Sequence, residues 1–257
     1  MKRLMISLAL VLMIGCKGDS NPTAKLQNVV KSTSQSSAIA TLVKAGADVN
    51  ALDDYGQTPL MNASARNHNS EIIVELIRHG ANVNARSRGQ NETPLMFAAE
   101  SNYELSVTTA LIRAGADVNA RGSGGYTPLM RAVAFSGDPE KIVVLVKAGA
   151  EINAKSSPYP EGDDLTSLMV AASLNEHPAM IVELIKQGAN VNMKNDAGVT
   201  ALMLAAQNNR IVLVIAELIK DGADVNAKDN KGKSVLDYAR ENKNQAIIDM
   251  LIKSGAK

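Results

Sequence analysis

The sequence predicts an all-α solenoid, in which short helix-turn-helix units stack in a row and are joined by β-turn or hairpin loops. Two recurring phrases predict this fold. The first, Gly-Ala-x-hydrophobic-Asn, places its glycine at positions 46, 80, 115, 149, 188 and 222. The second, Thr-x-Leu-Met, keeps the same phase and places its threonine at positions 58, 93, 127, 166 and 200. Two independent phrases that share one period of about 34 residues are typical of a repeat architecture.

The first fifteen residues have the order of a secretory signal peptide. Lys2 and Arg3 come first, residues 4–14 form an apolar run, and Gly15 follows. At about 1.5 Å per helical residue, this run is much shorter than the ~30 Å hydrocarbon core of a bilayer. It therefore predicts a signal peptide over residues 1–15 and an exported protein.

The single cysteine of the chain, Cys16, stands directly after the apolar run. Residues 13–16, Met-Ile-Gly-Cys, resemble the bacterial lipoprotein signal, although Met13 stands where leucine is usual. The resemblance implies cleavage before Cys16 and lipid on its sulfur and its new amino group. It also implies a membrane-anchored protein on the outer membrane or the periplasmic face. On this reading, residues 16–24 comprise the lipidated cysteine and a polar tether. The alternative is that Cys16 is incidental to an ordinary signal peptide.

Each later unit predicts two helices and a glycine stop. Thr58 suits the N-cap of a first helix because its hydroxyl can accept a hydrogen bond from a free backbone N–H. Pro59 suits the first helical position, where no N–H is needed. A second helix is indicated by apolar pairs spaced four residues apart, at Ile72, Ile73, Leu76 and Ile77. Gly80 is then expected to end that helix in the left-handed conformation.

These units resemble the ankyrin repeat from about residue 36 to residue 257. The resemblance implies two antiparallel helices per unit and a curved solenoid. We expect the repeat domain to cover residues 25–257. It would consist of a degenerate N-terminal cap at 25–51, five full repeats over 52–227 and a C-terminal cap at 228–257.

Three features depart from the family pattern. Methionine follows Thr-x-Leu where the family often has histidine, and this row of methionines predicts core packing. Asparagines near the inter-helix turns can adopt the left-handed conformation next best after glycine, at Asn67, Asn102, Asn175 and Asn208. Lys141 occupies a position that should be apolar, so either its helix is locally rotated or its stem carries the amine out to solvent.

Composition and spacing give no support to catalysis, cofactors, metals or nucleic acid. With 27 Lys and Arg against 26 Asp and Glu, the net charge is only +1, and there is no Trp for base stacking. The three histidines, His68, His79 and His177, lack metal-ligand spacing. A periodic basic row is expected to form a solvated, salt-bridged edge, at Arg86, Arg121, Lys155, Lys194 and Lys228.

In the ankyrin family, partners bind a concave groove formed by the turn tips and the exposed face of the first helices. The matching tip positions of this chain include Tyr55, Gln57, Arg88, Tyr126 and Lys233. The matching helix positions include Arg66, Glu100, Phe135, Leu174 and Asn208. Tyr159 lies in a five-residue insertion between two prolines. The alternatives are that a tip tyrosine packs on its own turn and that the insertion is merely tolerated.

The sequence thus predicts a non-catalytic module that binds a protein partner, attached to a membrane by its N-terminal lipid. We expect a monomer without cofactor, metal or nucleic acid. A stabilising factor that guards one envelope enzyme is the main alternative. A ligand-binding protein or an enzyme with an unrecognised site is the less favoured one.

Overall fold

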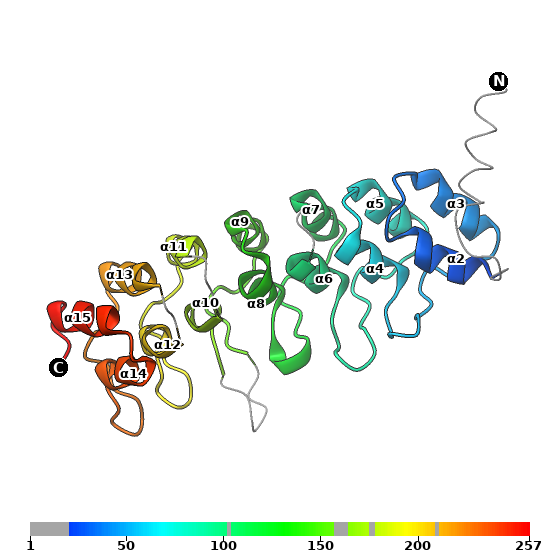
Figure 1. The fold of residues 1–257 in the computed structure, drawn as a ribbon. Helices are drawn as coiled ribbons and strands as arrows, with labels where there is room; N and C mark the ends of the chain where they lie inside the picture. The colour runs from blue at the N-terminus through cyan, green and yellow to red at the C-terminus, as the bar shows by residue number, and fades with distance from the viewer. Residues whose placement is uncertain (1–20, 102–103, 157–163, 175–177, 209–210) are drawn as a thin grey trace.

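The computed structural model describes residues 21–101, 104–156, 164–174, 178–208 and 211–257. These residues form an open row of paired helices, with α2 and α3 at one end and α14 and α15 at the other (Figure 1). Hairpin loops hang from one side of the row, and three of them are closed by isolated β-bridges, at Lys155–Thr166, Lys194–Thr200 and Lys228–Ser234. The predicted all-α solenoid is confirmed.

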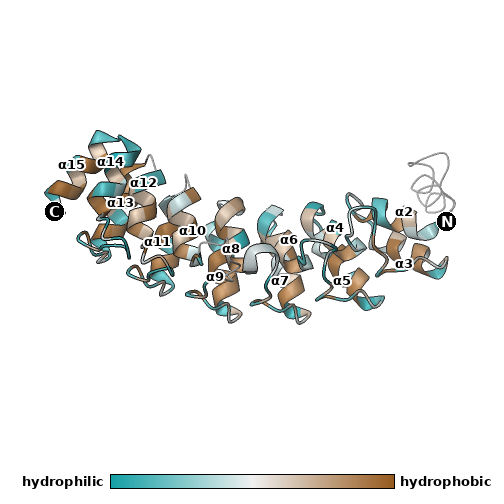
Figure 2. Ribbon diagram, turned by 90° about the horizontal axis from the view of Figure 1, so that it is seen from below, coloured by the Kyte–Doolittle hydropathy of each residue, from teal (hydrophilic) through white to brown (hydrophobic). Residues whose placement is uncertain are grey.

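The helices form two parallel layers. The row is curved, and the first helices of the central units lie on the inner side of the curve while the second helices lie on the outer side (Figure 2). The inner row consists of α2 (Pro22–Val29), α4 (Pro59–Arg66), α6 (Pro94–Ser101), α8 (Pro128–Arg131) with the π-helical η2 (Ala132–Ser136), α10 (Ser167–Leu174), α12 (Ala201–Asn208) and α14 (Val235–Asn242). The outer row consists of α3 (Ser36–Lys44), α5 (Ser70–Arg78), α7 (Leu105–Arg113), α9 (Pro139–Lys147), α11 (Pro178–Lys186), α13 (Val212–Lys220) and α15 (Gln245–Lys253).

Threonine begins the inner helices, as predicted. Thr58 Oγ1 accepts a hydrogen bond of 3.3 Å from the backbone N–H of Met61, and Pro59 occupies the first helical position of α4. The same bond, at 3.3 to 3.4 Å, recurs in the next four units, at Thr93, Thr127, Thr166 and Thr200. The cap satisfies a backbone donor that would otherwise have no partner at the helix start.

The methionine of four phrases, at positions 61, 96, 169 and 203, has a second role beside core packing. Met61 is fully buried, and its sulfur also accepts a hydrogen bond of 3.4 Å from the N–H of Thr58. The methionine therefore stands in for the glutamate of an ordinary capping box. In the last unit an acid takes this place, because Asp237 Oδ2 accepts from the N–H of Ser234 at 3.0 Å.

The outer helices supply the large apolar side chains of the core. Ile72, Ile73 and Leu76 of α5 are fully buried, as the four-residue spacing predicts. Gly80 follows α5 with φ at 90°, which confirms the left-handed stop.

The asparagine that closes each Gly-Ala-x-hydrophobic-Asn phrase bonds its unit to the next one. Asn84 Nδ2 donates to the carbonyl oxygen of Gly115 at 3.1 Å, and Asn84 Oδ1 accepts from the N–H of Asp117 at 2.8 Å. Both bonds recur, at 2.8 to 3.3 Å, for Asn50, Asn119, Asn153, Asn192 and Asn226. A single amide thus supplies a donor and an acceptor across each boundary, which explains why asparagine ends the phrase.

The predicted tether is too long by three residues. Helix α2 begins at Pro22, and the side chain of Asn21 caps it by accepting from the N–H of Thr23 at 2.9 Å. Residues 22–24 are therefore part of the first helical unit. Cys16 and the signal peptide lie outside the described residues.

The expectation of left-handed asparagines at the inter-helix turns is wrong where it can be examined. Asn67 is extended, with φ at −95°, and its side chain donates to the carbonyls of Val30 and Thr33 in the preceding unit, at 2.8 and 2.9 Å. Asn208 is the last residue of helix α12. Asn102 and Asn175 lie outside the described residues. The left-handed turn residues are instead Gly137 and Lys243.

Both expectations for Lys141 are wrong. Helix α9 is regular, yet the whole Lys141 side chain is buried. Its ammonium donates to the carbonyl oxygens of Ala98 and Ala99 in α6, at 3.2 and 2.9 Å. Ser136 stands where the first full repeat has Asn67, and its buried Oγ has no hydrogen-bond partner among the described residues. Lys141 therefore bonds this repeat to the preceding one at other carbonyls, within α6, where the repeat lacks the bridging amide.

Candidate functional site

One exposed side chain from each inner helix of the five full repeats occupies the same place in successive units. It is the eighth residue after the capping threonine, and the five members are Arg66, Ser101, Phe135, Leu174 and Asn208. All five are exposed. The inner helices stack side by side (Figure 2), so equivalent positions follow one another along the inner row. We call this row of positions, together with the adjoining hairpin tips, the inner face.

The centre of the inner face is apolar. Phe135 of η2 is 57% exposed and Leu174 of α10 is 59% exposed. The two belong to neighbouring units, whose inner helices pack against each other. Adjacent large apolar side chains in solvent mark a surface that a partner can bury.

Phe135 is held by a cluster around Arg131, which we call the Arg131 cluster and which consists of Glu92, Glu100, Tyr126, Arg131 and Phe135. The guanidinium carbon of Arg131 lies 5.5 Å from the centre of the Tyr126 ring and 5.9 Å from the centre of the Phe135 ring. Both distances suit a cation–π contact. Arg131 also pairs with Glu92 and, at 3.3 Å, with Glu100. The cluster therefore fixes an aromatic side chain at the surface.

Glu92 is the buried carboxylate of this cluster, and its charged form is disfavoured by desolvation. Its side chain is only 5% exposed, and burial raises its pKa, although the charge of Arg131 and a hydrogen bond from the N–H of Ser123 oppose the rise. Glu92 comes from the hairpin of the second full repeat and Arg131 from the inner helix of the third. The ion pair therefore also joins two repeats.

The tips differ in how much they offer to a partner. Tyr55 is 81% exposed, so it does not pack on its own turn. Its backbone N–H and that of Gln57 donate to Asp53 Oδ1, at 3.0 and 2.9 Å, which fixes the turn beneath it. Arg88 is exposed as well, while Gln57 and Tyr126 are half-buried. Tyr159 lies outside the described residues.

Sequence reasoning missed the roles of Glu92 and Arg131. They are 39 residues apart, in different repeats, and nothing within one repeat pairs them. The only usable signal was their place: Glu92 directly precedes the capping Thr93, and Arg131 is the fourth residue after Thr127, so the stacked phase brings them to neighbouring positions.

The basic row bonds mainly to backbone. Arg86 and Arg121 each donate to a carbonyl oxygen of the next unit, that of Arg121 and that of Lys155, at 2.6 Å. Lys194 does the same with Lys228 at 2.9 Å. The predicted salt-bridged edge is found at Lys155, which pairs with Asp164 at 2.7 Å and with Asp196 at 3.4 Å. The hydrogen bond that Lys155 donates to Asp164 raises the pKa of Lys155.

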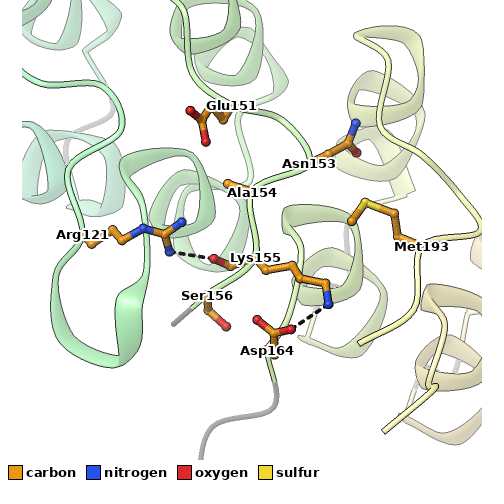
Figure 3. Close-up of a pocket in the computed structure, with 8 residues that line it drawn as sticks. All are labelled: Arg121, Glu151, Asn153, Ala154, Lys155, Ser156, Asp164 and Met193. Atoms are coloured by element: carbon orange, nitrogen blue, oxygen red, sulfur yellow. Dashed lines mark hydrogen bonds and ion pairs between the residues drawn. The ribbon is translucent and has the colours of Figure 1, made fainter. Parts of the chain in front are cut away.

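An open cavity of about 440 Å³ lies at this edge (Figure 3). Arg121 points to the carbonyl of Lys155, and the ammonium of Lys155 points to Asp164 (Figure 3). The charged groups of the lining that converge here are thus bonded to each other or to backbone. They stabilise the hairpins and leave no converging set directed into the cavity.

The described part of the chain shows no membrane-spanning helix and no cluster for a metal site. None of its helices is long and apolar enough to cross a bilayer. It also holds no group of three His, Cys, Asp or Glu side chains placed to bind a metal ion. Of the histidines, His68 is exposed, His79 pairs with Glu75 at 3.0 Å, and His177 lies outside the described residues.

Comparison with protein families decides the assignment. A model of ankyrin repeats matches the chain three times, over residues 26–122, 66–156 and 168–257. The chain belongs to the ankyrin-repeat family. A search of curated proteins finds no match. Ankyrin repeats are protein–protein interaction modules and are typically non-catalytic, so the inner face of this ankyrin-repeat chain is its candidate binding surface.

Proposed function

We propose that this ankyrin-repeat protein is a non-catalytic, monomeric module, exported and anchored by lipid on Cys16, that binds a partner protein on its inner face. The observation that carries the proposal is the exposed pair Phe135 and Leu174. The Arg131 cluster supports it, because a ring that is already held in place loses little conformational entropy on binding. Anchors of this kind dominate the affinity of many interfaces.

The export and the anchor are supported by the sequence alone. The basic start, the apolar run and the position of Cys16 suggest them. Residues 17–21 then separate the lipid from helix α2. More than one acyl chain on Cys16 would give firm attachment, since a single chain binds membranes only marginally. The anchor would place the repeats on the outer membrane or on the periplasmic face.

Two labelling experiments test the anchor. Radioactive palmitate should label the wild-type protein and should not label Cys16→Ser. An unlabelled wild-type protein would overturn the lipid anchor.

Light scattering of the soluble Cys16→Ser protein tests the monomer.

Affinity capture from native envelopes tests the surface. The double variant Phe135→Ser, Leu174→Ser removes the apolar centre of the inner face. The matched control is Leu213→Ser, because Leu213 is 53% exposed but lies on the outer helix α13. We expect the control to recover the same partner as the wild type and the double variant to lose it. Equal recovery by all three proteins would contradict the assignment of the inner face.

A further inference from the structure

The inner face has a charged end as well as an apolar centre. Arg66 and Arg88 are both exposed, and neither forms an ion pair with any described residue. Some exposed cations at the ends of outer helices are paired instead with an acid three residues earlier, as Arg78 is with Glu75 and Lys186 with Glu183. The two inner-face arginines therefore have their charge available to a partner.

Both arginines lie in the first two full repeats. Arg66 occupies the eighth position of α4, in line with Phe135 and Leu174. Arg88 lies on the second hairpin, and its backbone N–H donates to the carbonyl oxygen of Gly56 at 2.9 Å, which places it beside the first tip. That tip adds two carboxylates, of which Asp54 is exposed, while Asp53 is half-buried and accepts hydrogen bonds from the N–H groups of Tyr55 and Gln57.

The centre of the face offers no comparable charge. Arg131 is compensated by Glu92 and Glu100, and its guanidinium lies against two rings. A partner that follows the inner row thus meets free arginines at one end and apolar side chains two and three repeats further on. Its complement is a segment that is acidic at one end and apolar at the other.

The spacing of the repeats constrains that segment. Stacked helices lie about 8–10 Å apart. A polyproline II segment advances ~9 Å per turn of three residues, so every third side chain points to the same side. Arg66 and Phe135 are two repeats apart, so the side chains of the segment that contact them would be six residues apart. Phe135 and Leu174 are one repeat apart, so the side chains that contact them would be three residues apart.

We infer that the partner presents an extended, polyproline II-like segment in which an Asp or Glu contacts Arg66, while Arg88 attracts the same acidic end from the hairpin. Two large apolar residues, three apart, contact Phe135 and Leu174, and the first of them is six residues from the acid. The inference rests on the proposed function, because it names the partner chemistry of the same surface. The exposed aromatic side chain of Phe135 suits it, since segments of this kind dock on aromatic-lined grooves.

A displayed library of random 16-residue peptides tests the inference. The detergent-solubilised full-length protein is the bait, and enriched peptides are synthesised and titrated calorimetrically. We expect enrichment of the acid and the two apolar residues at the stated spacing. Arg66→Gln with Arg88→Gln should weaken binding about tenfold and reduce its salt dependence. The control Arg113→Gln, an exposed last-turn arginine on the outer helix α7, should bind like the wild type.

The possible failures are distinguishable. Enriched peptides that lack the acid, that space their apolar residues by seven as a helix would, or that bind the double arginine variant undiminished would overturn the inferred segment alone. Peptides that bind Phe135→Ser, Leu174→Ser as tightly as the wild type, or the absence of any enrichment, would overturn the proposed surface as well. Thermal melting followed by circular dichroism confirms that each variant is folded.

Discussion

The ammonium nitrogen of Lys141 lies 2.9 Å from the carbonyl oxygen of Ala99 and donates a hydrogen bond to it across the boundary between two repeats. A second bond, of 3.2 Å, goes to Ala98. Both carbonyls belong to the C-terminal half of α6, where the helix dipole favours a cation. A fully buried lysine thus links the second and third full repeats through the core.

Shortening this side chain should cost stability through lost packing. Lys141→Ala and Lys141→Met both remove the donor, but only alanine leaves a cavity where the lysine stem lay. We therefore expect Lys141→Ala to be about 2 kcal/mol less stable than Lys141→Met. Urea unfolding measures the difference, and equal free energies of unfolding would show that the stem is not part of the packed core.

The buried amine should also make stability depend on pH in the alkaline range. Burial lowers the pKa of Lys141 from 10.5 to about 8, with Asp138 opposing the shift. Below pH 8 the amine is protonated in both the folded and the unfolded chain. Between pH 8 and 10.5 the unfolded chain keeps the proton that the folded chain has released, so stability rises with pH in this window. The neutral amine still has two hydrogens for the two carbonyls.

The variant Lys141→Met isolates this effect from all other titrating groups. The free energy of unfolding of the wild type should increase relative to the variant by about 1 kcal/mol from pH 8 to pH 9. Urea unfolding at a series of pH values measures it. A difference that stays constant, or that falls as the pH rises, would contradict the assignment of a depressed pKa to Lys141.

Removing one partner of the ion pair between Glu92 and Arg131 should destabilise the protein more than removing both partners. Arg131→Gln leaves the buried Glu92 carboxylate without its partner and should cost about 3 kcal/mol. Adding Glu92→Gln removes that buried charge, so the double variant should recover part of the loss. A double-mutant cycle in urea measures the coupling, and additive losses would show that the two side chains act independently.

The asparagines that bridge successive repeats should contribute to the free energy of unfolding although they are exposed to solvent. Asn84→Ala removes two hydrogen bonds between repeats and should lower the free energy of unfolding by about 1 kcal/mol. Asn208→Ala serves as the control, because Asn208 is exposed at the end of α12 and forms no such bridge. Equal losses in the two variants, measured by urea unfolding, would deny the bridge an energetic role.

Local features of the fold could be predicted from the sequence. The threonine caps, the buried apolar pairs of the outer helices and the left-handed Gly80 depend on residues within a few positions of each other. Exposure along the inner row could be predicted by phase, because repeated positions stack: Tyr55, Arg66, Arg88, Phe135, Leu174 and Asn208 are all exposed.

Features that depend on contacts between repeats could not be predicted. Asn67 was expected to shape its own turn, but its amide bonds carbonyls of the preceding unit. The expectation for Lys141 rested on the apolar spacing within its own helix, whereas its hydrogen-bond partners lie more than 40 residues away. In the same way, the Gly-Ala-x-hydrophobic-Asn phrase did not reveal that its asparagine bonds the next repeat. The pairing of Glu92 with Arg131 could not be predicted either, because the two residues lie in different repeats.

The central claim is that a partner protein docks on the inner face. The most direct test places a photo-activated benzophenone amino acid at position 135 or at position 213 of the full-length protein in cells and compares the cross-linked products. The account predicts one discrete partner cross-linked from position 135 and none from position 213. A discrete product from position 213 with none from position 135 would contradict it.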